Sequence, residues 1–336
     1  MPAIKVLCIW KVNEELKSYL QKGLKSFPDV KIIFPSDISE SNLIELAIDA
    51  DVIVGWRPTE QLLNAALNLK LFINPGAGVH HQIALFRKIN MDRNIVLVNG
   101  HGNAYFTAQH GVALLLALMN KIIPHHNWMK EGKWRLGDKE ARSIPLRDRK
   151  IGFLGYGNVN RIIHKMLLGF DVDFAAVKYC WDKKPDLELI QFNLDELDDF
   201  LEFIDTLICA VPLTSNTKNM ITSKELRLLG KNGLLVNLSR GAVINESDLY
   251  KSLKNKFITR AAIDVWYNYQ PEPDEQGRKF PASYPFYELE NVVLSPHRAA
   301  SPFNDLNRWD EVIENISRLA RKKSDFLNVV ELQREY

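Results

Sequence analysis

A glycine-rich turn near the middle of the chain is the first segment whose residue types suggest a ligand. An apolar segment of strand length, Ile151–Leu154, runs into Gly155–Asn160, and a helix-like stretch follows. Gly155 would permit the tight bend, and Gly157 would let the backbone approach a pyrophosphate at the N-terminus of the helix. Asn160 stands where this fingerprint has its third glycine, so we expect a slightly displaced helix and an intact phosphate site. Because such a turn is often only a turn, the motif alone is weak evidence for a dinucleotide site.

Two pairs of adjacent histidines, His80 with His81 and His125 with His126, raise the question of a metal site. A zinc site normally needs three or four ligands. No cysteine or carboxylate lies at ligand spacing from either pair, so we expect no metal.

The composition limits the class of protein. Hydrophobic residues make up 46% and charged residues 25% of the 336 residues, which are ordinary values for a globular chain. The net charge of +2 creates no field that favours nucleic acid or an anionic membrane. Cys8, Cys180 and Cys209 form no C-x-x-C pair and indicate a reducing compartment, and the N-terminus has no signal-peptide pattern. The longest apolar run, Val112–Met119, is too short to cross a bilayer, so we expect a soluble, cytoplasmic protein.

The elements that must position the glycine-rich turn follow from the apolar periodicity. Strand-like and helix-like segments alternate, which predicts parallel sheets covered by helices, and at roughly 150 residues per domain the length indicates about two domains. The expected strands of the first series are Ile4–Trp10, Lys31–Phe34, Val52–Gly55, Leu71–Ile73 and Ile95–Val98. The expected strands of the second series are Ile151–Leu154, Asp173–Tyr179, Thr206–Val211, Leu234–Asn237, Arg260–Val265 and Val292–Leu294. The last stretch, Asp305–Leu327, again has helical periodicity.

Three segments in the second half of the chain resemble a known family. They are Leu235–Asn245, Ala262–Trp266 followed by Pro271-Glu272-Pro273, and Asn291–Ala300. In order and spacing they resemble the D-isomer-specific 2-hydroxyacid dehydrogenases. Shorter matching segments are Pro75–Val79, Val98–Gly100, Ala108–His110, Gly132–Trp134 and Val211–Thr214.

The resemblance implies an α/β fold of two Rossmann-like domains with the active site in the cleft. A flavodoxin-like substrate-binding domain would comprise residues 1–99 and 302–336, and an NAD(P)-binding Rossmann domain would comprise residues 100–301. A homodimer is also implied, and we expect its contact at the arm around Trp134, because an aromatic side chain on a polar arm suits a pocket in a partner. The expected partners are a small 2-keto or 2-hydroxy acid and a second copy of the chain, with no nucleic acid and no membrane.

Hydride transfer to a 2-keto acid explains why these residue types occur together. Arg240 would bind the carboxylate and polarise the carbonyl, because its guanidinium stays charged and can donate two parallel hydrogen bonds. His297 would protonate the carbonyl oxygen as a general acid with a pKa near neutrality. A carboxylate beside this imidazole would orient it and raise its pKa, and the resemblance assigns that role to Glu272. Because Trp266–Gln270 carries a short insertion, Gln270 is a rival occupant, as in some relatives that act on formate.

Further binding positions are carried over from the resemblance. The substrate would contact Arg57 and the backbone N–H groups of a loop that includes Ala77, Gly78 and Val79, in addition to Arg240. Asp264 would contact the nicotinamide amide. The expected cofactor positions are Thr107, Gly155, Tyr156, Gly157, Asn158, Val159, Lys178, Val211, Pro212, Thr217 and Asp264.

The residue at the end of the second Rossmann strand indicates which nicotinamide cofactor is used. Counting from Gly155, this position falls at Lys178, where NAD-specific relatives typically have an aspartate that binds the ribose hydroxyls. Lys178 could pair with a 2′-phosphate, and no carboxylate follows until Asp182. We therefore expect NAD(P)(H) with NADP(H) narrowly favoured; the alternative is that Lys178 points to solvent and Asp182 binds the ribose.

Three functions remain open at this point. The leading hypothesis is an NAD(P)-dependent dehydrogenase that interconverts a small 2-keto acid, such as glyoxylate or hydroxypyruvate, and its D-2-hydroxy acid. A second is a cofactor-sensing interaction protein of the corepressor type, which uses the same fold. A third keeps the cofactor and changes the substrate to a small inorganic or one-carbon acid such as phosphite or formate.

Overall fold

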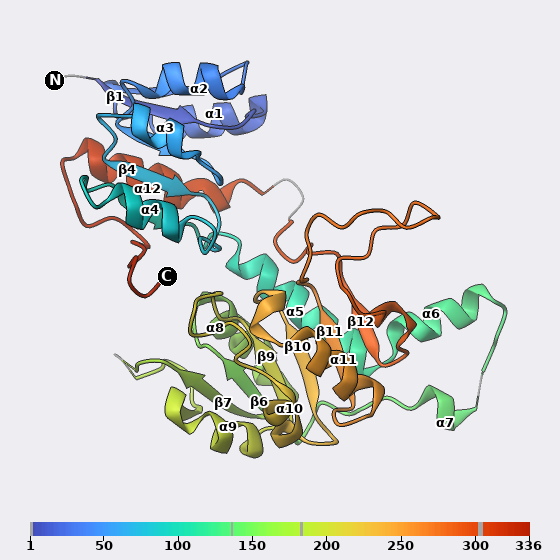
Figure 1. The fold of residues 1–336 in the computed structure, drawn as a ribbon. Helices are drawn as coiled ribbons and strands as arrows, with labels where there is room; N and C mark the ends of the chain where they lie inside the picture. The colour runs from blue at the N-terminus through green and yellow to red at the C-terminus, as the bar shows by residue number, and fades with distance from the viewer. Residues whose placement is uncertain (1–2, 136, 182–183, 302–304) are drawn as a thin grey trace. The chain divides into compact units, whose positions relative to one another are not determined.

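The computed structural model describes residues 3–135, 137–181, 184–301 and 305–336, and the chain divides into two compact units (Figure 1). The first unit combines the residues up to Asn103 with the C-terminal segment that ends at Tyr336. The second unit runs from Ala104 to Ser301.

The first unit is built on a five-stranded parallel sheet. Its strands are β1 (Ile4–Cys8), β2 (Val30–Ile33), β3 (Val52–Val54), β4 (Leu71–Asn74) and β5 (Val96–Asn99). Their order, β2-β1-β3-β4-β5, is that of a flavodoxin-like sheet. The strands predicted from the apolar runs are therefore confirmed. β1, β3, β4 and β5 are mostly buried, as expected for strands of a parallel sheet that is covered on both faces, whereas the edge strand β2 has no buried residue.

Helices cover the two faces of this sheet and produce two separate apolar cores. They are α1 (Glu14–Gly23), α2 (Glu40–Ala47), α3 (Glu60–Ala65), α4 (Ile83–Ile89) and α12 (Asp310–Ala320). The C-terminal α12 packs against α1, and a Cβ added at Gly23 would meet the side chain of Ile313. Just before α12, the Trp309 ring stacks on Trp10 with centroids 5.5 Å apart. The C-terminal segment therefore packs against the residues that follow β1.

The second unit is built on a seven-stranded parallel sheet. Its strands are β6 (Lys150–Leu154), β7 (Asp173–Lys178), β8 (Ile190–Asn193), β9 (Thr206–Cys209), β10 (Leu234–Asn237), β11 (Arg260–Ile263) and β12 (Val292–Leu294). The order β8-β7-β6-β9-β10-β11, extended by β12, is that of a dinucleotide-binding Rossmann sheet, and it reverses direction between β6 and β9. The predicted pair of Rossmann-like domains is confirmed.

One strand of this sheet was not predicted. β8 lies at the edge, and Ile190, Gln191 and Asn193 are exposed while Phe192 is half-buried. An exposed edge strand needs no apolar run, so the periodicity that identified the other strands is absent here.

Helices pack on both faces of the second sheet (Figure 1). They are α5 (Ala104–Met119), α8 (Asn158–Leu167), α9 (Leu197–Phe203), α10 (Ser223–Leu229) and α11 (Glu246–Lys254). α5 and α8 contribute to one core, and α9, α10 and α11 contribute to the other.

An arm formed by α6 (Ile122–Lys130) and α7 (Asp138–Ala141) projects away from the sheet of the second unit (Figure 1). No residue of α6 is buried, and Trp134 after it is 72% exposed. Among the described residues, no single helix is long and apolar enough to cross a membrane; α5 and α6 pass that test only as a pair, which is bent by 64°.

Candidate active site

The glycine-rich turn joins β6 to α8, and its two glycines serve different purposes. Gly155 has φ +78°, and an added Cβ would lie 2.6 Å from Cγ1 of Val211, so both the backbone and the packing require glycine. Gly157 has φ −96°, which any residue adopts, and an added Cβ would meet nothing within 4 Å. The fold itself therefore does not need glycine at 157. The open space beside it, at the N-terminus of α8, fits the pyrophosphate of a dinucleotide.

Asn160, which replaces the third glycine, ties α8 to the sheet. The side chain is fully buried, and its amide donates to the carbonyl oxygen of Gly155 at 2.6 Å and, at longer range, to those of Leu154 and Ile208. From the sequence we expected only a displacement of the helix. The structure shows that this amide also binds the carbonyl groups at the ends of β6 and β9.

Three other predicted cofactor residues lie in or directly after the turn. Tyr156 is buried, and its hydroxyl lies 2.8 Å from Nδ1 of His164, whose pKa burial lowers to about 4. The phenol of Tyr156 is therefore engaged inside the unit. Asn158 and Val159 begin α8 directly after the turn.

The loop after β9 lies beside the glycine-rich turn. Val211 is the side chain that a Cβ at Gly155 would strike. The Thr217 hydroxyl donates to the carbonyl oxygen of Pro212 at 2.6 Å and accepts the N–H of Thr214 at 2.8 Å, which closes the loop on itself. These predicted cofactor residues thus gather where the strand order reverses, whereas Thr107 lies on α5.

Lys178 is the last residue of β7, as the count along the sequence predicted. Its Nζ lies 5.8 Å from the centroid of the Trp181 ring, whose Nε1 donates to the carbonyl oxygen of Phe192 at 2.9 Å. Asp182, the alternative ribose ligand, lies outside the described residues.

A buried carboxylate, Asp264, directly follows β11 and is only 1% exposed. It accepts the hydroxyl proton of Ser295, and His110 Nε2 lies 3.0 Å from the same hydroxyl oxygen and 3.6 Å from Oδ1 of Asp264. From the sequence, neither Ser295 nor His110 was assigned a role. Each lies inside a segment that matched the family, and that was the signal available.

The same carboxylate shapes the backbone at His297. Asp264 accepts the N–H groups of Arg298 at 2.9 Å and of Ala299 at 3.2 Å. To direct these two successive N–H groups at one carboxylate, His297 adopts φ +57°, a conformation that costs a non-glycine residue roughly 1–3 kcal/mol. Asp264 therefore holds the imidazole in place through the backbone that follows it.

Arg240 and His297 belong to one charged cluster in the second unit. Arg240 follows β10, and its Nη1 donates to the carbonyl oxygen of Ser239 at 2.7 Å. Burial lowers the pKa of His297, the charges of Arg240 and Arg298 lower it further, and Asp264 raises it. The structure thus brings together the predicted guanidinium and the predicted general acid at the carboxyl ends of β10 and β12, the two strands that flank β11.

Neither predicted partner of His297 lies against it. Glu272 is exposed, and no hydrogen bond or ion pair among the described residues joins it to His297. Gln270 is also exposed, with its N–H donating to Oδ1 of Asn268 at 2.9 Å. The side chain beside the imidazole is Tyr269, with ring centroids 5.2 Å apart, and the sequence analysis did not identify it.

The predicted substrate loop lies in the first unit, after β4. The N–H groups of Ala77, Gly78 and Val79 donate to no acceptor among the described residues, while the carbonyl oxygen of Ala77 accepts Nδ2 of Asn99 at 3.0 Å. Successive free N–H groups form a concavity suited to an anion such as a carboxylate. The predicted Arg57 is exposed on the loop after β3.

A network of side-chain amides fixes this loop. Gln82 Nε2 donates to Oδ1 of Asn74 at 2.8 Å and to the carbonyl oxygen of Trp56 at 2.5 Å. His81 Nε2 lies 2.7 Å from the same carbonyl oxygen. An added Cβ at Gly76 would lie 3.3 Å from Nε1 of Trp56, so the indole lies directly against the loop. Among the described residues, no group of three or more His, Cys, Asp or Glu side chains could hold a metal ion.

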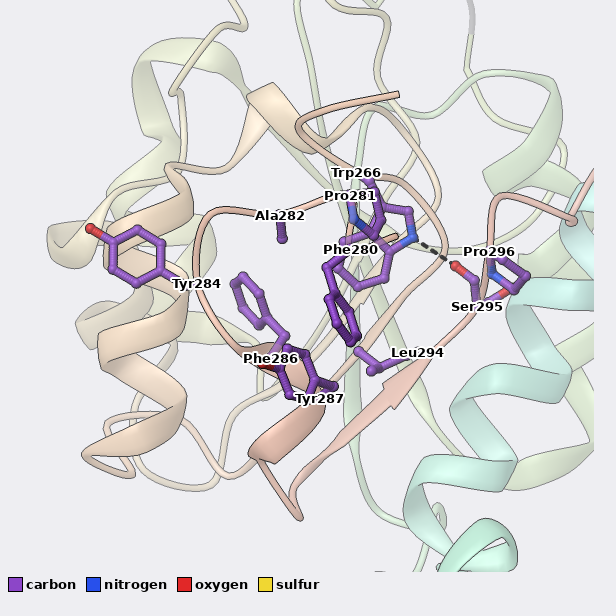
Figure 2. Close-up of a pocket in the computed structure, with 10 residues that line it drawn as sticks. All are labelled: Trp266, Phe280, Pro281, Ala282, Tyr284, Phe286, Tyr287, Leu294, Ser295 and Pro296. Atoms are coloured by element: carbon purple, nitrogen blue, oxygen red, sulfur yellow. Dashed lines mark hydrogen bonds between the residues drawn. The ribbon is translucent and has the colours of Figure 1, made fainter. Parts of the chain in front are cut away.

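A separate apolar pocket of about 190 Å³ lies in the second unit (Figure 2). It is lined by Trp266, Phe280, Pro281, Ala282, Tyr284, Phe286, Tyr287, Leu294, Ser295 and Pro296. Trp266 Nε1 donates to the carbonyl oxygen of Ser295 at 2.8 Å, as the dashed line in Figure 2 marks. Arg240 and His297 are not in its wall, and its aromatic lining does not suit an acid substrate.

Comparisons with known proteins agree with this arrangement. The family profile of the D-isomer specific 2-hydroxyacid dehydrogenase, NAD binding domain, matches residues 112–299. A D-3-phosphoglycerate dehydrogenase of Archaeoglobus fulgidus is 29% identical over 95% of this chain, which spans only 58% of that relative's length. A hydroxypyruvate reductase of Thermotoga maritima is 27% identical over 91% of this chain and 96% of its own.

Solved structures share the fold. One of them is an NADPH-dependent glyoxylate/hydroxypyruvate reductase from Sinorhizobium meliloti in complex with NADP and malonate. It superposes with a TM-score of 0.73 at 23% identity and covers 99% of this chain and 98% of its own. At this identity the likeness concerns the fold alone.

Proposed function

Because the chain belongs to the D-isomer-specific 2-hydroxyacid dehydrogenase family, we propose that it is an NAD(P)-dependent oxidoreductase. It would interconvert a small 2-keto acid of the glyoxylate or hydroxypyruvate type and its D-2-hydroxy acid. The observation that carries this proposal is the cluster of Arg240, Asp264 and His297 after β10, β11 and β12, in the same sheet whose β6 ends in the glycine-rich turn.

The cofactor would be held by the second unit. The space beside Gly157, the N-terminus of α8 and the loop from Val211 to Thr217 surround the switch point of the sheet, where dinucleotides bind in this fold. The bound nicotinamide supplies the hydride chemistry, and the protein supplies orientation and charge.

Each polar group of the proposed substrate, the carboxylate and the carbonyl, has a matching hydrogen-bond or proton donor in the chain. The N–H groups of Ala77, Gly78 and Val79 would bind the carboxylate, and Arg240 would bind it and polarise the carbonyl. His297 would transfer a proton to the carbonyl oxygen during reduction and accept it during oxidation. Asp264 would keep the imidazole turned toward that oxygen by holding the backbone after it.

We propose that NADP(H) is preferred to NAD(H). Lys178 ends β7, which is the position from which a Rossmann domain reads the ribose 2′ substituent. A lysine there attracts a 2′-phosphate that an aspartate would repel.

We also propose a homodimer in the cytoplasm. The arm of α6 and α7 has exposed apolar side chains, including Ile122, Met129 and Trp134, which a second copy of the chain would cover. Among the described residues, Cys8, Cys180 and Cys209 form no disulfide, which suits a reducing compartment.

The test is a panel of substrates with each reduced cofactor, followed through the loss of reduced-nicotinamide absorbance. We expect turnover with glyoxylate or hydroxypyruvate. Oxidation of phosphite or formate with no turnover of any 2-keto acid would replace the proposal with the inorganic or one-carbon alternative. Cofactor binding without any turnover would favour the corepressor alternative.

A further inference from the structure

The groups that face the His297 imidazole come from four places in the second unit. Arg240 follows β10, Asp264 follows β11, Arg298 is the next residue in the chain, and Tyr269 lies on the loop after β11. The hydrogen bonds of Asp264 come from Ser295 and from two backbone N–H groups, and among the described residues none joins it to the imidazole. The direct neighbour of the imidazole is therefore the Tyr269 ring.

Tyr269 is fixed at that place by its hydroxyl. The hydroxyl oxygen accepts the N–H of Trp266 at 3.3 Å, and the ring lies at 58° to the imidazole. Burial raises the pKa of Tyr269, and the nearby N–H of Trp266 and the charge of Arg240 only partly offset this effect. The phenol is thus neutral at physiological pH, although the residue is 51% exposed.

The loop that carries Glu272 is closed by hydrogen bonds between its own residues, and none of them involves the imidazole of His297. The N–H groups of Tyr267 and Asn268 both donate to the carbonyl oxygen of Pro281, at 3.2 and 3.0 Å. Further along, Asp274 accepts N–H groups from Arg278 and Gln276. Glu272 lies between these two closures, and the flanking prolines restrict its backbone.

We infer that Tyr269 is the positioning residue of His297 in this chain and takes the place of a carboxylate partner. The inference rests on the proposed function, because it assigns a role in the proton transfer of that reaction. The insertion at Trp266–Gln270 brings an aromatic ring to the imidazole and leaves the following glutamate in solvent.

The pH dependence of the reaction follows from this pairing. A neutral phenol does not stabilise the imidazolium, so the pKa of His297 stays below its ordinary value because of burial, Arg240 and Arg298, against Asp264 alone. Reduction needs the protonated imidazole, and its rate falls as pH rises through this pKa. Oxidation needs the neutral imidazole, and its rate rises over the same interval.

The experiment combines a histidine titration with kinetics. Histidine-selective isotope labelling lets NMR follow the pKa of His297, with His297→Asn identifying its signal, in the wild type, Tyr269→Ala, Tyr269→Phe, Tyr269→Glu and Glu272→Gln. Tyr287→Ala is the matched control, because Tyr287 is an exposed tyrosine that stacks on Phe280 instead. Thermal unfolding checks that each variant is folded.

We expect Tyr269→Ala to lower kcat by about tenfold with little change in KM, since general acid catalysis supplies roughly 10²–10⁴-fold and only its positioning is lost. Tyr269→Phe, which keeps the ring and loses the hydrogen bond to Trp266, should recover part of that loss. Tyr269→Glu should raise the pKa of His297 by about one unit or more and move the fall in the reduction rate to higher pH. Glu272→Gln should leave the pKa of His297 where it is.

A lower pKa of His297 in Glu272→Gln would overturn the inference, because Glu272 would then be the partner. An unchanged kcat in Tyr269→Ala would overturn it as well. The titration needs no substrate, so a wild type that reduces no 2-keto acid would refute the proposed function while the His297 titrations still decide the pairing.

Discussion

At the scale of single residues, the charges around the candidate catalytic histidine are unequal. Two guanidinium groups, from Arg240 and Arg298, face His297 with one buried carboxylate, Asp264. Burial, together with this excess of positive charge, lowers the pKa of the imidazole and favours its neutral form. The positive charge also creates a field that attracts an anionic substrate. The same residues would thus bind the acid and set the proton affinity of the group that reacts with it.

Arg240→Ala should remove carboxylate binding and carbonyl polarisation together. We expect kcat/KM for the 2-keto acid to fall by about 10³-fold, as for the loss of a preorganised charged donor. Steady-state kinetics measure the loss, and nucleotide titration should give an unchanged cofactor Kd. Arg278→Ala is the control, because Arg278 pairs with Asp274 on an exposed loop. An equal loss of cofactor affinity would show that Arg240 supports the fold instead.

Lys178→Asp should reverse the cofactor preference. A carboxylate at the end of β7 would bind ribose hydroxyls and repel a 2′-phosphate, so the ratio of kcat/KM with NADPH to that with NADH should fall by about tenfold or more. Lys165→Asp on the exposed side of α8 provides a matched change of charge. A wild type that prefers NADH, with a preference that the substitution leaves unchanged, would contradict the assignment of Lys178.

At the scale of elements, the turn between β6 and α8 separates what the fold needs from what a ligand needs. Gly155 is constrained by its backbone and by Val211, whereas Gly157 is constrained by neither. Asn160 then joins α8 to the carbonyl groups of the sheet from inside. The glycine that the fold requires and the glycine proposed to face the pyrophosphate thus stand two residues apart in one turn.

Alanine at each glycine should separate these two effects. Gly155→Ala should lower the free energy of unfolding by roughly 1–3 kcal/mol, because φ is +78° and Val211 is in the way. Gly157→Ala should change that free energy by less than about 0.5 kcal/mol and still weaken cofactor binding. Urea unfolding and nucleotide titration measure the two quantities. Full cofactor affinity in Gly157→Ala would show that the open space is not the pyrophosphate site.

At the scale of the whole molecule, each unit has its own sheet and its own cores. The first unit is discontinuous, since α12 and the C-terminal segment join the strands of the first hundred residues, and Val329 bridges to Val98 of β5. Helix α6 of the second unit has no buried residue, so its surface is left exposed.

Trp134→Ala should weaken the proposed dimer. Light scattering at micromolar concentration should give twice the chain mass of 38.6 kDa for the wild type and a shift toward the monomer for the variant. Trp181→Phe is the control, because Trp181 packs near Lys178 in the second unit rather than on the arm. A wild-type mass of one chain would refute the dimer.

The sequence alone determined those features that depend on residues close together in the chain. The strands of both sheets, apart from the exposed edge strand β8, follow from short apolar runs. The position of Lys178 at the end of β7 follows from a count along the chain, and the glycine-rich turn follows from its neighbours. Local periodicity and backbone preference suffice for these features, because both act over only a few residues.

Only the tertiary structure decided which distant side chains meet. His110 and Ser295 are far apart in the chain, and they meet at Asp264 because α5 packs against β11 and β12. The sequence left Glu272 and Gln270 as rivals beside His297, and the structure places Tyr269 there. The physical reason is that the family spacing predicts positions only up to an insertion. After the insertion, packing and backbone hydrogen bonds, such as those to the carbonyl oxygen of Pro281, determine which side chain points toward the imidazole.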